Sequence, residues 1–197
     1  MLSQRLGTTD IYVPFSFDFE EIDAGFSALA EKLGISLQDP TAKRQACIDA
    51  LKETLDLIGS TPIAIDYTYC PRPLGLAKLL LDHGFNVQRV YLDAVTGEEK
   101  KVFEDLKAQH PTLELFPTVH ASMRFLARKE PSDYLAIGQK AAQFLNTRHF
   151  VNVVEGGGML GYQAVLKTLA LMREAFLEEK DTRNLIQVKG MGCGGCV

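Results

Sequence analysis

The segment Asp66–Pro73, which reads DYTYCPRP, holds the densest group of side chains capable of chemistry in the sequence. A carboxylate, two phenols, a thiol and a guanidinium occur within seven residues. Cys70 comes just before a predicted helix and two residues before Arg72, so the helix dipole and the cation would stabilise its thiolate. Cys70 is therefore a candidate ligand of a metal or cluster, or a redox thiol. The alternative is a small residue that fills a tight turn.

The other polar residues of this segment have two interpretations each. Arg72 would hold an anionic ligand with its forked guanidinium, or it would pair with a nearby acid at the surface. Asp66 would bind a ligand or orient a base, or it would accept hydrogen bonds from turn amides. Tyr67 and Tyr69 would form an aromatic platform for a ligand, or they would pack against the rest of the protein.

A second candidate segment is rich in glycine and reads EGGGMLG from Glu155 to Gly161. Gly156, Gly158 and Gly161 satisfy the spacing GxGxxG between a predicted strand and a predicted helix, where backbone amides would cradle an anion. Together with Glu155 and Gly157 they are candidate binding residues. However, no acid ends a strand about 20 residues further on, as a dinucleotide site requires. A close backbone turn is the alternative.

Two further cysteines, Cys193 and Cys196, form a C-x-x-C pair near the C-terminus. One such pair begins a metal or redox site, but a zinc site needs about four ligands. We expect either a tail that becomes ordered with a metal or a partner, or an uninvolved tail. The candidate metal ligands are thus Cys70, Cys193 and Cys196.

Alternating strand and helix patterns position these segments. Short apolar runs predict five strands, at 63–65, 87–92, 113–119, 133–138 and 150–154. Helical spacing and capping residues predict helices that begin near Asp18 and Asp39, and others at 74–83, after Thr96, at 122–128, at 139–145 and through Val165–Phe176. Strands that alternate with helices imply an α/β protein with a doubly wound, parallel, Rossmann-like sheet of order 3-2-1-4-5.

This pattern divides the chain into three parts. Residues 1–59 form an extended segment and two helices that pack on the core, residues 60–178 form the Rossmann-like domain, and residues 179–197 form a mobile tail. In an open parallel sheet, ligands bind beyond the carboxyl ends of the strands, where the strand order reverses. The segment Asp66–Pro73, the turn Gly138–Lys140 and the loop Glu155–Gly158 would meet there.

Composition restricts the class of protein. The chain has 197 residues, a net charge of −4, 46% hydrophobic residues and 23% charged residues, which suits one globular domain. The absence of a basic stripe argues against a nucleic-acid partner. No apolar run reaches the roughly 20 residues of a membrane span, and the first residues lack the basic segment and apolar stretch of a signal peptide. These features predict a cytoplasmic protein whose four cysteines are thiols or ligands rather than disulfides.

Three stretches resemble the nitrogenase-type component-1 oxidoreductases: IGSTPIAIDYTYCPRPLGLAKLLLDHGFNV, PSDYLAIGQKAAQFL and GGGMLGYQAVLKTL. This family includes nitrogenase molybdenum–iron subunits, cofactor-assembly scaffolds and protochlorophyllide reductase subunits. The resemblance implies one of three similar units that enclose an iron–sulfur or related metallocluster, or a tetrapyrrole. It implies similar subunits and an ATP-dependent iron protein as partners. It also implies that Asp66–Pro73 and Val151–Leu160 line the cavity.

The sequence departs from this family at the cofactor ligand. The family's cofactor-binding histidine would fall near Val151, but the nearest histidine, His149, lies two residues away. Three functions therefore remain open. The first is a nitrogenase-like oxidoreductase domain or subunit in a homo- or hetero-oligomer, transferring electrons to a metallocluster- or tetrapyrrole-type substrate. The others are a non-catalytic metallocofactor-binding or carrier module, and a nucleotide-dependent enzyme that uses Gly156–Gly161.

Overall fold

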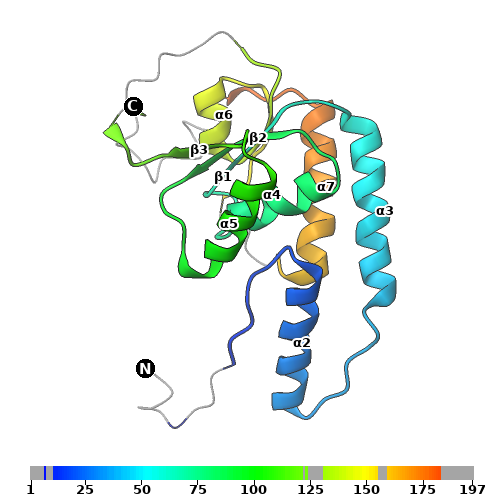
Figure 1. Cartoon of the computed structure of the whole chain (residues 1–197). Helices are drawn as coiled ribbons and strands as arrows, with labels where there is room; N and C mark the ends of the chain where they lie inside the picture. Colours follow the sequence, from blue (N-terminus) through cyan, green and yellow to red (C-terminus); the bar gives the residue numbers. More distant parts are fainter. Residues whose placement is uncertain (1–6, 8–10, 122, 124–130, 155–158, 183–197) are drawn as a thin grey trace.

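A computed structural model describes residues 7, 11–121, 123, 131–154 and 159–182 (Figure 1). Its helices are α2 (Phe19–Leu33), α3 (Thr41–Ile58), α4 (Pro73–Asp82), the short 3₁₀ helix η1 (Gly97–Glu99), α5 (Lys100–Gln109), α6 (Gln139–Leu145) and α7 (Gly161–Leu177). Its strands are β1 (Ile63–Asp66), β2 (Val87–Leu92), β3 (Glu114–Pro117), β4 (Leu135–Ile137) and β5 (His149–Val151). Among the described residues, no helix is long and apolar enough to cross a membrane.

The five strands form one parallel sheet in the order β3-β2-β1-β4-β5, which confirms the predicted fold class. The sequence 113–119 was predicted at an edge, and β3 lies there. All four residues of β1 are buried, as expected of a central strand covered on both faces. The predicted short helix at 122–128 falls almost entirely outside the described residues.

Successive side chains of the strands point to opposite faces of the sheet, and each face has its own hydrophobic core. Ile63, Ile65 and Ile137 face the layer that contains α3, α4 and α7. Ala64 and Ala136 face the opposite layer, where they pack with residues of α6. Because successive strand residues point to opposite faces, these short apolar runs build both cores at once. The small alanines on the second face let the seven-residue helix α6 lie close to the sheet.

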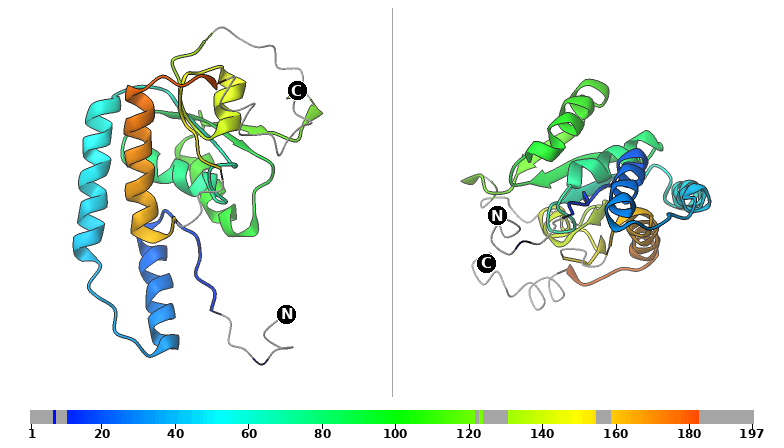
Figure 2. Two further views of the ribbon diagram at one scale, coloured as in Figure 1. Left: turned by 180° about the vertical axis from the view of Figure 1, so that it is seen from behind. Right: turned by 90° about the horizontal axis from the view of Figure 1, so that it is seen from below.

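The N-terminal helices extend the first layer sideways. Cys47, Leu51, Thr54 and Ile58 form the buried face of α3. They lie in the same core as α7, and the rear view in Figure 2 shows α3 running beside that helix. At the start of α2, the Asp18 carboxylate accepts the Glu21 N–H at 2.9 Å, as the predicted cap requires. The buried face of α3 is thus covered by α7.

The spacing of Thr96 and Glu99 in the sequence is that of a capping box, but the structure has no such cap. Thr96 makes no side-chain hydrogen bond to the helix that it precedes. Instead the buried Glu99 carboxylate accepts the backbone N–H of Gly75 at 2.9 Å, in the first turn of α4. Arg72, at the start of α4, provides no side-chain cap, so Glu99 supplies an acceptor for the exposed amides of that helix end.

Candidate functional site

The carboxyl ends of β1 and β4 form the point at which the strand order reverses. Ile63 pairs with Leu135 and Ile65 pairs with Ile137, in parallel. The segment after β1 and the turn after β4 therefore leave the sheet at one edge. This is the switch-point rim, which we define as residues 66–73 and 138–140. It is the place where ligands bind in open parallel sheets.

Asp66 ties the two halves of this rim together. Its side chain is fully buried. One carboxylate oxygen accepts the Thr68 N–H at 2.7 Å and the Thr68 hydroxyl, and the other accepts the Ala141 N–H of α6 at 2.7 Å. Burial raises the pKa of Asp66, while these hydrogen bonds and the charge of Lys140 act in the opposite direction. Asp66 thus acts as the acceptor of turn amides, the alternative to direct ligand binding.

Gly138 is the counterpart of Asp66 on the β4 side. Its backbone has a φ of 115° and a ψ of 158°, a conformation that essentially only glycine adopts. A Cβ atom at this position would lie 2.5 Å from Cγ of Asp66. Gly138 is therefore required for the close approach of the carboxylate to α6.

Tyr67 and Lys140 form a half-buried pair at the surface of the same rim. The Lys140 ammonium donates a hydrogen bond to the Tyr67 hydroxyl, and Nζ lies 4.4 Å from the centre of the ring. Sequence reasoning used Lys140 only as the boundary of a turn. The signal that identifies it is the parallel pairing of β1 with β4, because that pairing brings the residue after β1 to the turn after β4.

Tyr69 and Cys70 point into the core rather than into the rim. Tyr69 is fully buried, and its hydroxyl lies 2.7 Å from that of Thr168 on α7. The Cys70 side chain is also buried, and burial raises the pKa of its thiol. The expected stabilisation of a Cys70 thiolate is therefore wrong, because desolvation outweighs the helix dipole and Arg72 directs its charge to other groups. Tyr69 packs against the rest of the protein, which is the second of its two interpretations.

Cys70 is expected to be inert toward thiol reagents in the folded protein. We expect carboxamidomethylation at Cys70 to be at least about a hundredfold slower in buffer than in concentrated urea, because only the exposed thiolate reacts. Peptide mass spectrometry separates Cys70 from the other cysteines, and the buried Cys47 is an internal reference. Rapid labelling of Cys70 but not of Cys47 in buffer would contradict this prediction and show that Cys70 is a reactive thiol.

Tyr69 gives the fold a pH dependence in the alkaline range. Burial raises the pKa of Tyr69 from 10.0 to about 12. Since the folded state holds this proton more tightly, the stabilisation is complete below pH 10.0 and is lost as the pH rises through about 12. We therefore expect urea unfolding to show wild type losing stability relative to Tyr69→Phe over this range. The other tyrosines are common to both proteins, so a constant difference would contradict the assignment.

Arg72 lies at the end of the rim, where it joins two distant segments. Its side chain is buried, and its guanidinium lies 2.9 Å from the Glu21 carboxylate of α2 and 2.7 Å from that of Glu98 in η1. This is the acid-paired alternative, although the arginine is buried rather than at the surface. Arg72 therefore fixes the first turn of α2 against the loop after β2.

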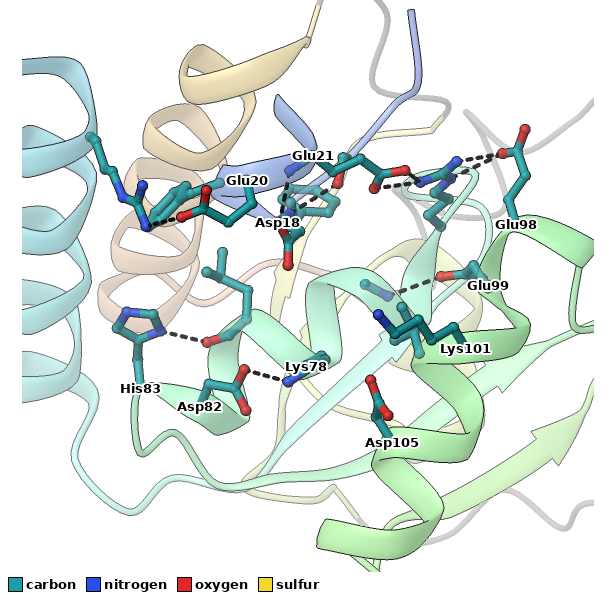
Figure 3. A pocket seen from close by; sticks show the side chains of 18 residues that line it. Asp18, Glu20, Glu21, Lys78, Asp82, His83, Glu98, Glu99, Lys101 and Asp105 are labelled. Atoms are coloured by element: carbon teal, nitrogen blue, oxygen red, sulfur yellow. Dashed lines mark hydrogen bonds and ion pairs between the residues drawn. The ribbon is translucent and has the colours of Figure 1, made fainter. Parts of the chain in front are cut away.

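A cavity of about 600 Å³ lies beside Arg72, between the first turn of α2, α4 and α5 (Figure 3). Phe17, Leu79 and Val102 give it apolar walls. Its charged lining residues largely pair with one another, as in the ion pair of Lys78 with Asp82 at 2.7 Å. Sequence reasoning missed this cavity because its walls come from segments far apart in the chain.

Among the candidate residues of the glycine-rich segment and of the C-terminal cysteine pair, only Gly161 lies within the described residues. Glu155, Gly156, Gly157 and Gly158 lie outside the described residues, as do Cys193 and Cys196, so their roles remain predictions. Gly161, which completes the glycine spacing, has a φ of 58°, and a Cβ there would lie 2.6 Å from the Phe26 ring of α2. Packing between α7 and α2 therefore accounts for this glycine.

A resident metal finds no complete ligand set in the described part of the chain. No group of three or more His, Cys, Asp or Glu residues there is arranged to hold a metal ion. Cys70 lies in the core, where burial raises the pKa of its thiol, and the Asp66 carboxylate accepts backbone amides. The metallocluster implied by the resemblance is thus not matched by the described residues alone.

Comparisons with known proteins identify the fold. No protein-family model matches the chain, and no curated protein matches it. Among solved structures, nitrogenase Cp1 at pH 6.5 superposes with a TM-score of 0.57 and 13% sequence identity. The chain has a nitrogenase-like fold. The likeness covers 89% of this chain and 42% of that protein, so this chain spans less than half the length of the protein it resembles.

Proposed function

We propose that this chain is a nitrogenase-like oxidoreductase domain or subunit, which works with partner chains in electron transfer to a metallocluster- or tetrapyrrole-type substrate. The observation that carries the proposal is the superposition on nitrogenase Cp1 over 89% of this chain. Because 89% of the chain is covered, the match extends beyond the sheet domain proposed for residues 60–178. The rim at the β1–β4 switch point is the proposed wall of the substrate cavity.

Partner chains are part of this proposal for a chemical reason. The described residues hold no complete ligand set for a metal. In this proposal, partner chains or other residues of this chain complete the set. We propose nitrogenase-like subunits as the structural partners and an ATP-dependent iron protein as the electron donor. Within this chain, residues 1–59 would be a packing extension, 60–178 the cavity-forming unit, and Cys193 and Cys196 ligands in the tail.

A non-catalytic metallocofactor-binding or carrier module is the second candidate. This candidate is favoured because the polar side chains of three rim residues make contacts within the protein. These residues are Asp66, Tyr69 and Arg72. A carrier needs a shaped surface and ligands, but no acid, base or nucleophile. In this function Cys193 and Cys196 would take the metallocofactor from one partner and deliver it to another.

Anaerobic purification from the native source, followed by metal analysis and visible absorption, tests both candidates. The proposed function predicts bound partner chains, iron and substrate reduction when an iron-protein reductant and ATP are added. A carrier would bind iron without turnover, and Cys193→Ser with Cys196→Ser would abolish its metal uptake while Cys70→Ala would not. An iron-free chain without partners or turnover would refute both.

A further inference from the structure

We propose that the cavity beside Arg72 binds a small organic cation, an ammonium or guanidinium group carried on an apolar body. This inference goes beyond the proposed function and does not rest on it. The cavity lies between the first turn of α2, α4 and α5 (Figure 3), and Arg72 is the residue that it shares with the switch-point rim. Its volume, its apolar walls and its charge together identify the class of ligand.

The cavity has the size and the walls of a small-molecule site. Its volume of about 600 Å³ lies within the range of about 300–1,000 Å³ that such sites have. Phe17 and Leu79 are buried and Val102 is half-buried, and they come from the segment before α2, from α4 and from α5. An apolar group in the cavity would therefore meet walls that three different elements supply.

The lining of the cavity carries an excess of negative charge. Seven of its side chains are carboxylates, and four are lysines or arginines. Arg72 pairs with two of these carboxylates and Lys78 with one, as described above, and Arg44 pairs with Glu20 at 2.8 Å. Ion pairs thus occupy three of the four cations, and carboxylates remain.

Asp18 and Asp105 are two of the carboxylates that remain. Asp18 uses one oxygen to cap α2, and Asp105 is half-buried without a hydrogen bond or ion pair in the described part of the chain. A third carboxylate, Glu99, is used by the N-terminus of α4. Lys101 lies one turn before Asp105 but is exposed and forms no ion pair with it. A cation in the cavity would give Asp18 and Asp105 the partner that they lack.

A guanidinium group already occupies surroundings of this kind at the cavity. The Arg44 guanidinium lies 5.4 Å from the centre of the Phe19 ring while it pairs with Glu20. A ring face beside a carboxylate favours a guanidinium or ammonium group. A bare metal ion fits less well, because no group of three or more His, Cys, Asp or Glu residues in the described ranges is arranged to hold one. The cavity therefore suits a cation with an apolar body.

Amide NMR titration of the full chain tests the site. The probe is benzylamine, whose ammonium group is carried on a benzene ring, and its matched probes are neutral benzyl alcohol and anionic benzoate. Each is used at millimolar concentration and constant ionic strength. We expect benzylamine to give saturable shifts at the amides of 17–21, 75–79 and 101–105. It should bind at least about fivefold more tightly than either matched probe, because only its ammonium group donates charge-assisted hydrogen bonds to carboxylates.

A blocked tripeptide with a central lysine separates a small molecule from a partner protein. It presents an ammonium group from a peptide backbone, as a partner's side chain would. The volume of the cavity predicts that the tripeptide binds more weakly than benzylamine. Tighter binding of the tripeptide would overturn the assignment to a small molecule.

Variants with opposite expected effects identify the charge of the ligand. Asp105→Asn and Asp18→Asn should each weaken benzylamine binding about fivefold, because each removes a negative charge, and asparagine at 18 still caps α2. Lys101→Met should strengthen binding several-fold, because it removes a like charge. Glu104→Gln is the matched control, since Glu104 is exposed beside Asp105 but does not line the cavity, and it should leave binding unchanged.

The proposal is overturned if benzylamine gives no saturable shifts, or if benzyl alcohol or benzoate binds as tightly. It is also overturned if Lys101→Met weakens binding, because the cavity would then prefer an anion. Lys101 is exposed, so this variant keeps the test decisive if an aspartate variant fails to fold. The titration uses neither iron nor partner chains, so its failure leaves the proposed electron-transfer function standing.

Discussion

Replacing Gly138 by alanine is expected to destabilise the fold by at least about 3 kcal/mol, because it combines a forbidden backbone conformation with a clash in a packed interior. The backbone of Gly138 has a φ of 115°, and the new Cβ would lie 2.5 Å from Cγ of Asp66. The carboxylate has no room to move, since both of its oxygens accept backbone N–H groups. Urea unfolding followed by circular dichroism measures the loss.

Gly59→Ala is the matched control for this prediction. Gly59 also has a positive φ, 62°, but a Cβ there meets no atom within 4 Å. Its ψ is −133°, also a conformation that favours glycine, so its substitution should cost only the backbone strain, about 1–3 kcal/mol. Equal losses for the two variants would show that Asp66 does not approach Gly138 as described. In the double variant Asp66→Gly with Gly138→Ala the clash is relieved, so the loss of unfolding free energy should be smaller than the sum of the two single losses. A strictly additive loss would contradict that coupling.

The fold was predictable because it depends on order along the chain. Five short apolar runs separated by helical patterns, together with right-handed crossovers, lead to one strand order, and the structure has it. The position of the switch-point rim, the candidate site, followed for the same reason. Once β1 and β4 are neighbours, the segment beginning at Asp66 and the turn beginning at Gly138 must leave the sheet at the same edge.

The roles of the rim residues were less predictable because they depend on burial and on distant partners. Cys70 seemed reactive from its place before a helix, but its environment is the core. Arg72 meets Glu21, which lies 51 positions earlier in the sequence. Lys140 meets Tyr67 across 73 positions. One sequence carries no signal for such pairs until the sheet has brought them together.

Asp66→Asn is expected to cost about 2 kcal/mol of unfolding free energy, the penalty of leaving one buried donor without an acceptor. The carboxylate accepts from Thr68 with one oxygen and from the Ala141 N–H with the other. An amide offers only one oxygen, so its NH₂ group must face a donor on one side. Asp66→Leu removes both acceptors and should cost about 3 kcal/mol or more. Urea unfolding near neutral pH gives both values.

Asp18→Asn provides the comparison that separates a bridging carboxylate from an ordinary cap. Asp18 also accepts one backbone N–H, that of Glu21 at 2.9 Å, but it is exposed and uses one oxygen for it. Asparagine caps helices as well as aspartate does, so this variant should be nearly neutral. If Asp66→Asn were equally neutral, Asp66 would not join β1 to α6. The rim would then lack the rigidity that places Lys140 beside Tyr67.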